Sequence, residues 1–162
     1  MQINDAIKYA TQKLDSSNSK RIDSEILLCS ILKCSRPILY AYPDKVLSST
    51  DKNKFEELVN MRSKGYPIAY LTKQKEFWAH ILHINENILI PRPETELLVE
   101  KSLELISTYS LNKILELGTG SGAIAISIAS EKSKINIKAT DISDYVIKIA
   151  RKNANLYKIK NI

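Results

Sequence analysis

The stretch ILELGTGSGAIAISIA, residues 114–129, restricts the fold of this chain more than any other part of its sequence. Three of the chain's four glycines occur here at alternate positions, Gly118, Gly120 and Gly122. Glycine lets the backbone adopt a positive φ and lets a ligand approach the main chain closely. The apolar run before the glycines predicts a strand over residues 113–117, and the Ile/Ala-rich run after them predicts a helix over residues 123–131. A strand, a glycine turn and a helix in this order are typical of the cofactor-binding edge of a parallel sheet.

The residues on either side of this stretch extend the pattern. A predicted strand over residues 135–140 and a predicted helix over residues 143–156 follow it, and alternating strands and helices indicate an α/β fold with a parallel sheet. Before it, residues 76–93 alternate between apolar and polar, which predicts a β-hairpin with its turn at residues 85–87. A further helix is expected to begin at Pro93, with helical spacing at Leu97, Leu98, Lys101 and Leu105.

Residues 1–72 predict a separate, all-helical domain. Apolar residues recur at helical spacing over residues 2–14, 21–34 and 51–63, and Gly65 is expected to end the last of these helices. Ser49 or Thr50 is the expected N-cap of that helix. On the helix over 21–34, the expected buried face carries Ile22, Ile26, Cys29 and Leu32. We therefore expect a helical domain at 1–72, a β-hairpin linker at 73–92 and an α/β domain at 93–162.

Composition narrows the class of protein. The chain has 162 residues, of which 44% are hydrophobic and 26% charged, as in ordinary globular proteins. It has no apolar run long enough for a membrane span and no secretory signal, so we expect a cytoplasmic protein. Residues 1–75 hold 13 basic and 8 acidic residues, which places +5 of the net charge of +6 there. This basic excess is compatible with an RNA or ribosome-associated partner, but a solvated lysine-rich surface is the favoured interpretation.

The chain offers few candidate metal ligands. Cys29 and Cys34 lack a CxxC spacing and a nearby pair of histidines, so we expect two reduced core thiols. His80 and His83 lie three residues apart in a predicted strand, hence on opposite faces, which argues against a shared metal ion. No metal site is predicted.

Three classes of ligand compete for the glycine loop. A nucleotide-binding P-loop is excluded because no Lys-Ser/Thr pair follows the glycines. A dinucleotide fingerprint is formally matched by Gly118, Gly120 and Ala123, and the pattern Glu-x-Gly-x-Gly-x-Gly of S-adenosylmethionine-binding loops is matched from Glu116 onward. A tight strand-to-helix turn without a ligand is the remaining alternative.

The charge of Glu116 favours the methyl donor. A carboxylate at the end of the strand repels a pyrophosphate but attracts the ammonium and sulfonium groups of S-adenosyl-L-methionine. Asp141, at the end of the next predicted strand, is placed to accept hydrogen bonds from ribose hydroxyls in either cofactor class. The predicted cofactor-binding residues are therefore Glu116, Gly118, Thr119, Gly120, Ser121, Gly122 and Asp141.

Longer segments carry a family resemblance. EFWAHILHINENILIPRPETELLVE, residues 76–100, resembles the segment just before the cofactor loop in the HemK/PrmC family of protein-glutamine N5-methyltransferases, and DSEILLCSIL, LYAYPD and GYPIAYLT resemble that family's helical N-terminal domain. Lys73 stands where many members have glycine after LT, which puts the shape of that turn in question. The resemblance implies a substrate-recognition domain followed by the first part of a Rossmann-like class I methyltransferase domain. It also implies methylation of the glutamine in the GGQ motif of peptide-chain release factors by a monomer, with no direct binding to nucleic acid or membrane.

One motif of that family is missing. Its acceptor motif, Asn-Pro-Pro-Tyr, does not occur in this sequence. We therefore expect a truncated, N-terminal portion of such an enzyme, with no catalytic residue of its own, no methyl transfer in isolation, and an uncovered sheet edge and apolar face that lower its solubility. Two alternatives remain: an amino methyltransferase acting on nucleic acid, and a non-catalytic remnant or binding module.

Four residues before the glycine loop have open roles. Arg92 and Glu94 either line the donor pocket or pair with each other on the surface. Phe77 and Trp78 either stack on adenine or protein substrate, or pack in the hairpin's core, which is the favoured interpretation.

Overall fold

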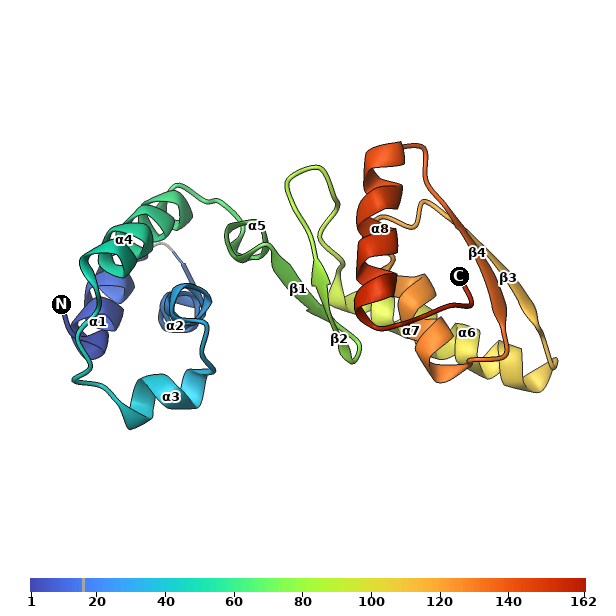
Figure 1. The fold of residues 1–162 in the computed structure, drawn as a ribbon, viewed down its shortest axis with the longest axis horizontal. Coiled ribbons are helices and arrows are strands. Elements are labelled where there is room, and N and C mark those ends of the chain that lie inside the picture. Colours follow the sequence, from blue (N-terminus) through green and yellow to red (C-terminus); the bar gives the residue numbers. More distant parts are fainter. Residues whose placement is uncertain (16) are drawn as a thin grey trace. The chain divides into compact units, whose positions relative to one another are not determined.

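A computed structural model describes residues 1–15 and 17–162, and it divides them into two compact units, Met1–Thr72 and Lys73–Ile162 (Figure 1). Each unit contains its own cluster of buried apolar side chains. The two units are described separately below.

The first unit is helical. Helices α1 (Ile3–Lys13) and α2 (Lys20–Leu32) pack on each other, and both contact α4 (Ser49–Ser63). The N-cap of α4 is Ser48, whose Oγ accepts a hydrogen bond from the Asp51 N–H at 3.0 Å, so the predicted cap at Ser49 or Thr50 was wrong by a residue or two. Gly65 follows α4 with φ of +93°. The elements are α1 (Ile3–Lys13), α2 (Lys20–Leu32), α3 (Arg36–Ala41), α4 (Ser49–Ser63) and α5 (Ile68–Thr72).

The predicted buried face of α2 was only partly right, because Cys29 and Leu32 are half-buried against the core of this unit but Ile22 is not. Ile22 is 48% exposed, whereas Asp23 and Glu25 are buried. Charged partners make this burial possible: Arg62 Nε donates to Asp23 Oδ2 at 2.8 Å, and Arg36 forms an ion pair with Glu25. A buried carboxylate is tolerated only when it is paired and hydrogen-bonded. Periodicity of apolar residues could not show this, because the partners come from other helices.

The second unit combines a hairpin with a strand–helix–strand–helix segment. Strands β3 (Lys113–Leu117) and β4 (Asn136–Thr140) pair in parallel, from Lys113 opposite Asn136 to Leu117 opposite Thr140, and α7 (Ala123–Glu131) connects them. This confirms the predicted alternation of strands and helices. The elements are β1 (Gln74–Phe77), β2 (His80–His83), a 3₁₀ turn at Pro93–Thr95, α6 (Glu96–Thr108), β3 (Lys113–Leu117), α7 (Ala123–Glu131), β4 (Asn136–Thr140) and α8 (Asp144–Leu156).

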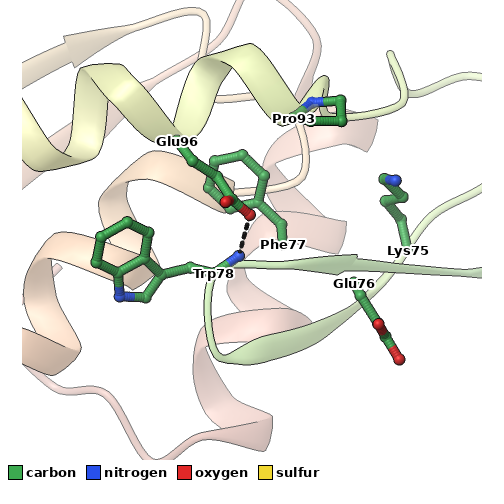
Figure 2. A pocket seen from close by; sticks show the side chains of 6 residues that line it. All are labelled: Lys75, Glu76, Phe77, Trp78, Pro93 and Glu96. Atoms are coloured by element: carbon green, nitrogen blue, oxygen red, sulfur yellow. Dashed lines mark hydrogen bonds between the residues drawn. The ribbon is translucent and has the colours of Figure 1, made fainter.

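The hairpin exists, but its predicted turn was wrong. β1 and β2 are joined directly after Phe77, which pairs with His80, and the chain reverses at Trp78 with φ of +55°. Glu96 Oε1 accepts the backbone N–H of Trp78 at 2.8 Å, so a contact from α6 supports a turn that has no glycine, asparagine or proline (Figure 2). Residues 85–88 form a separate turn, closed by the Ile88 N–H and the Asn85 carbonyl at 3.0 Å. The residues that favour a turn, at 85–87, therefore do form one, but it lies in the loop after β2 and does not join the two strands of the hairpin.

Lys73 keeps the conformation that glycine would favour. Its φ is +58°, in the left-handed region, and its carbonyl accepts the N–H of Ile84 at 3.2 Å. The turn between α5 and β1 thus retains a left-handed residue although its side chain is a lysine.

One face of the β3–β4 pair packs against helices, and the other face is exposed. Buried residues of β4 and α7, such as Ile126, Ile128 and Ile137, form the core with Val99 and Ile106 of α6. By contrast, Leu115 and Leu117 of β3 are 61% and 76% exposed. Leu97, Leu98, Lys101 and Leu105, whose spacing predicted this helix, lie on α6 but are exposed. In the described residues, one face of β3 is therefore apolar and uncovered.

Candidate functional site

The glycine loop connects β3 to α7 and turns sharply. Gly118, Gly120 and Gly122 all have positive φ, at 73°, 57° and 84°. A Cβ added at Gly118 or Gly120 would meet no atom within 4 Å, whereas one at Gly122 would lie 3.0 Å from Cδ1 of Ile126. A side chain at Gly122 would therefore press on Ile126 within the unit. Gly118 and Gly120 leave their backbone facing open space, as close approach by a ligand requires.

Glu116 lies beside this loop and is partly buried. Its Oε2 accepts a hydrogen bond from the Thr119 hydroxyl at 3.0 Å. Burial raises the pKa of the Glu116 carboxyl above its usual value, the charge of Asp141 adds to this rise, and the hydrogen bond from Thr119 opposes it. A carboxylate whose ionisation is made costly by burial is stabilised by any cation placed next to it.

Asp141 joins the loops that follow the two parallel strands. Its Oδ2 accepts the Gly120 N–H at 3.0 Å, and its Oδ1 accepts the Ser143 N–H at 3.2 Å. A carboxylate has about four acceptor positions, so two remain for hydroxyl groups of a ligand. The Thr119 N–H also donates to the Thr140 carbonyl at 2.8 Å. The structure thus brings the loop, Glu116 and Asp141 together at the carboxyl ends of β3 and β4.

The other two loop residues point inward. Thr119 and Ser121 are buried, and the Thr119 hydroxyl is engaged by Glu116. The carbonyl of Ser121 accepts a hydrogen bond from Nδ2 of Asn153 at 2.9 Å. Sequence reasoning missed Asn153; the available signal was an asparagine inside a predicted helix, where its propensity is low.

The residues around the hairpin tip divide into core and surface. Phe77 is buried in the core of the second unit, and the indole N–H of Trp78 donates to Glu131 Oε1 at 3.0 Å, which favours the packing interpretation for both. Arg92 and Glu94 are exposed, and no ion pair between them is found among the described side chains. A hollow of about 260 Å³ lies beside Trp78. Figure 2 shows the side chains that line it, Lys75, Glu76, Phe77, Trp78, Pro93 and Glu96.

A larger cavity, of about 570 Å³, lies between α7, β4 and α8. Its lining includes the apolar side chains of Ile126, Ile137 and Ile147 and also Thr119 and Gly122 of the glycine loop, but neither Glu116 nor Asp141. Because both carboxylates lie outside this lining, we place the candidate site at the carboxylates. Within the described part of the chain, no group of three or more possible metal ligands occurs, and no helix has the length and apolarity to cross a membrane.

The chain resembles known proteins over both units. Residues 5–72 match the family described as PrmC N-terminal domain, and residues 93–162 match the family described as Methyltransferase small domain. A Coxiella burnetii protein named release factor glutamine methyltransferase is 44% identical over 162 residues, which are 99% of this chain and 58% of that protein.

Proteins of the same name from other bacteria give similar values. The Aliivibrio fischeri protein is 40% identical over 149 residues, which are 92% of this chain and 52% of that protein. The Leptospira interrogans protein is 44% identical over 137 residues, which are 84% of this chain and 48% of that protein. The chain spans about half the length of these curated relatives.

Proposed function

The chain belongs to the family of release factor glutamine methyltransferases, the HemK/PrmC family, and on that premise we propose that it binds S-adenosyl-L-methionine at the glycine loop. The observation that carries this proposal is the partly buried Glu116 carboxylate next to a loop whose backbone faces open space at Gly118 and Gly120. A buried negative charge suits a cationic ligand and disfavours a pyrophosphate.

The residues present suit this cofactor. The backbone of the loop, Gly118, Thr119, Gly120, Ser121 and Gly122, would contact the donor, and the free acceptor positions of Asp141 would hold ribose hydroxyls. Glu116 would stabilise the positive charge. When bound, the cofactor supplies a methyl group on a positively charged sulfur. The parallel β3–β4 pair with its connecting helix supports the view that this unit is the first part of a Rossmann-like class I methyltransferase domain.

The relatives' name suggests the acceptor. We infer that the protein acts in the methylation of the glutamine in the GGQ motif of peptide-chain release factors, and that the helical unit recognises the release factor. An amide nitrogen is a weak nucleophile because its lone pair is delocalised into the carbonyl. Catalysis therefore depends on holding the amide in position with fixed hydrogen-bond acceptors.

The acceptor motif of this family, Asn-Pro-Pro-Tyr, is absent from the 162 residues. We therefore propose that these residues bind the donor and the release factor, and that they do not transfer the methyl group by themselves. This division separates donor binding, which can be measured on this chain, from catalysis.

Calorimetric titration of the purified chain tests donor binding. S-adenosyl-L-methionine is expected to bind, and NAD, titrated in the same way, is not. Binding of NAD in place of the methyl donor would overturn the proposal. Transfer of labelled methyl groups to a release factor by this chain alone would refute the division between donor binding and catalysis.

A further inference from the structure

The outer edge of β2 is held by Asn153 of α8 and by Tyr157, the C-cap residue of that helix. The hydroxyl of Tyr157 accepts the Ile81 N–H at 2.6 Å and donates to the Ile81 carbonyl at 2.9 Å. One turn earlier in α8, Oδ1 of Asn153 accepts the His83 N–H at 2.8 Å, and its Nδ2 donates to the His83 carbonyl at 3.0 Å. Each side chain therefore satisfies both backbone groups of one strand residue.

The spacing of the two elements makes this pairing possible. Four residues along a helix advance about 6 Å, and two residues along a strand advance about 6.7 Å. Asn153 and Tyr157 therefore meet His83 and Ile81 in antiparallel order. α8 takes the place of a neighbouring strand at an edge that would otherwise expose unpaired backbone groups.

Asn153 differs from Tyr157 in one further contact. Its Nδ2 also donates to the carbonyl of Ser121, between the second and third glycines of the loop, at 2.9 Å. The residue is fully buried, and its two N–H groups and its oxygen are all engaged. A single side chain thus connects the hairpin, the glycine loop and the helix that follows Asp141.

We propose that Asn153 is a positioning residue of the donor site, which orients the glycine loop through the carbonyl of Ser121. This proposal rests on the proposed function, because it assigns the loop to a donor. The peptide groups around Ser121 include the N–H of Gly122, which donates to the Thr119 carbonyl, and Thr119 in turn contacts Glu116. A change at Ser121 is therefore transmitted to the side of the loop that meets the ligand. The competing explanation is that Asn153 only attaches the hairpin.

Two variants of the full chain separate these explanations. Asn153→Asp keeps an acceptor for the His83 N–H but removes both donors. Tyr157→Phe removes the two hydrogen bonds to Ile81 and leaves the contact with the loop intact. Both variants weaken the attachment of β2, so both are expected to lower the urea midpoint of unfolding. Only Asn153→Asp is expected to weaken binding of S-adenosyl-L-methionine, by about tenfold or more, because it leaves the Ser121 carbonyl unpaired. Tyr157→Phe is expected to change the Kd for S-adenosyl-L-methionine by less than about twofold.

The outcomes are distinct. Equal changes in Kd for the two variants, or no change in either, would overturn the positioning role. If Asn153→Asp does not fold, NMR of the unaltered chain decides: the Asn153 side-chain amide should shift together with the Ser121 and Gly122 amides during donor titration, and a static signal would refute the proposal.

If the unaltered chain binds no donor, the proposed function fails, and hydrogen exchange still tests the loop. Gly120 and Gly122 amides should then exchange faster in Asn153→Asp than in Tyr157→Phe, and equal rates would contradict the proposal.

Discussion

Replacing Glu116 with glutamine tests the electrostatic basis of donor binding. Glutamine has nearly the same shape and can still accept the hydrogen bond from the Thr119 hydroxyl, but it carries no charge. A hydrogen bond to a charged group contributes about 1.5–3 kcal/mol, and about 1.4 kcal/mol corresponds to a tenfold change in Kd. We therefore expect the Kd for S-adenosyl-L-methionine, measured by calorimetry, to rise about 10- to 100-fold in Glu116→Gln.

The same variant has a predictable effect on stability. Because burial raises the pKa of Glu116, the folded chain binds its proton more tightly than the unfolded chain does. The free energy of unfolding therefore falls as the pH rises from the unfolded pKa through the folded pKa. Glu116→Gln removes this loss, so its urea midpoint at pH 8 should exceed that of the unaltered chain when no ligand is present.

Two controls make the result specific. Glu100→Gln removes one negative charge at an exposed position of α6 and should alter neither the Kd for S-adenosyl-L-methionine nor the urea midpoint at pH 8. S-adenosylhomocysteine lacks the charged sulfur, so its affinity should fall less than that of the methyl donor. If Glu116→Gln bound both ligands as tightly as the unaltered chain, the assignment of the carboxylate to a cationic ligand would be refuted.

Three further predictions concern stability and solubility. Burial lowers the pKa of His80, and the charge of Glu131 opposes this, so the free energy of unfolding should decrease as the pH falls below about 6.5. Urea midpoints measured between pH 8 and pH 5 should show this decrease. His80→Phe should make the pH dependence smaller, and His83→Gln should leave it unchanged. Gly122→Ala should lower the free energy of unfolding by about 1–3 kcal/mol. The loss should exceed that of Gly118→Ala, because a Cβ at Gly122 would lie 3.0 Å from Cδ1 of Ile126 and one at Gly118 would meet no atom within 4 Å. Equal urea midpoints of the two variants would contradict this. Leu115 lies on the uncovered face of β3, so Leu115→Lys should reduce the aggregation measured by light scattering. The same variant should change the free energy of unfolding by less than about 0.5 kcal/mol. Unchanged aggregation would show that another surface is responsible.

Patterns confined to a few neighbouring residues could be predicted from the sequence. The helix Ala123–Glu131 and the strand Lys113–Leu117 have the bounds that their apolar runs indicate. Positive φ at Gly118, Gly120 and Gly122 follows from residue type, since glycine alone adopts it without strain. The roles of Glu116 and Asp141 remain predictions, although the structure brings both to the glycine loop.

The errors arose where distant residues decide the local outcome. The hairpin turns at Trp78 because Glu96 accepts its N–H, and these residues are 18 positions apart. The buried face of α2 contains Asp23 because Arg62, 39 positions away, neutralises it. Neither partner is visible in the periodicity of the segment that it changes, because periodicity records only which residues share a face of the same element.

By itself, the sequence determined the order of strands and helices over residues 113–156, the glycine turn and the acidic residues that flank it, since these depend on backbone preferences and on neighbours along the chain. Tertiary structure alone decided how the hairpin joins the second unit: Asn153 and Tyr157 reach backbone groups 70 and 76 positions away in β2. The physical reason is that an unpaired N–H or C=O of a strand edge must find a partner when it is buried. Any polar side chain that the fold brings within reach can provide it, at any separation in the sequence.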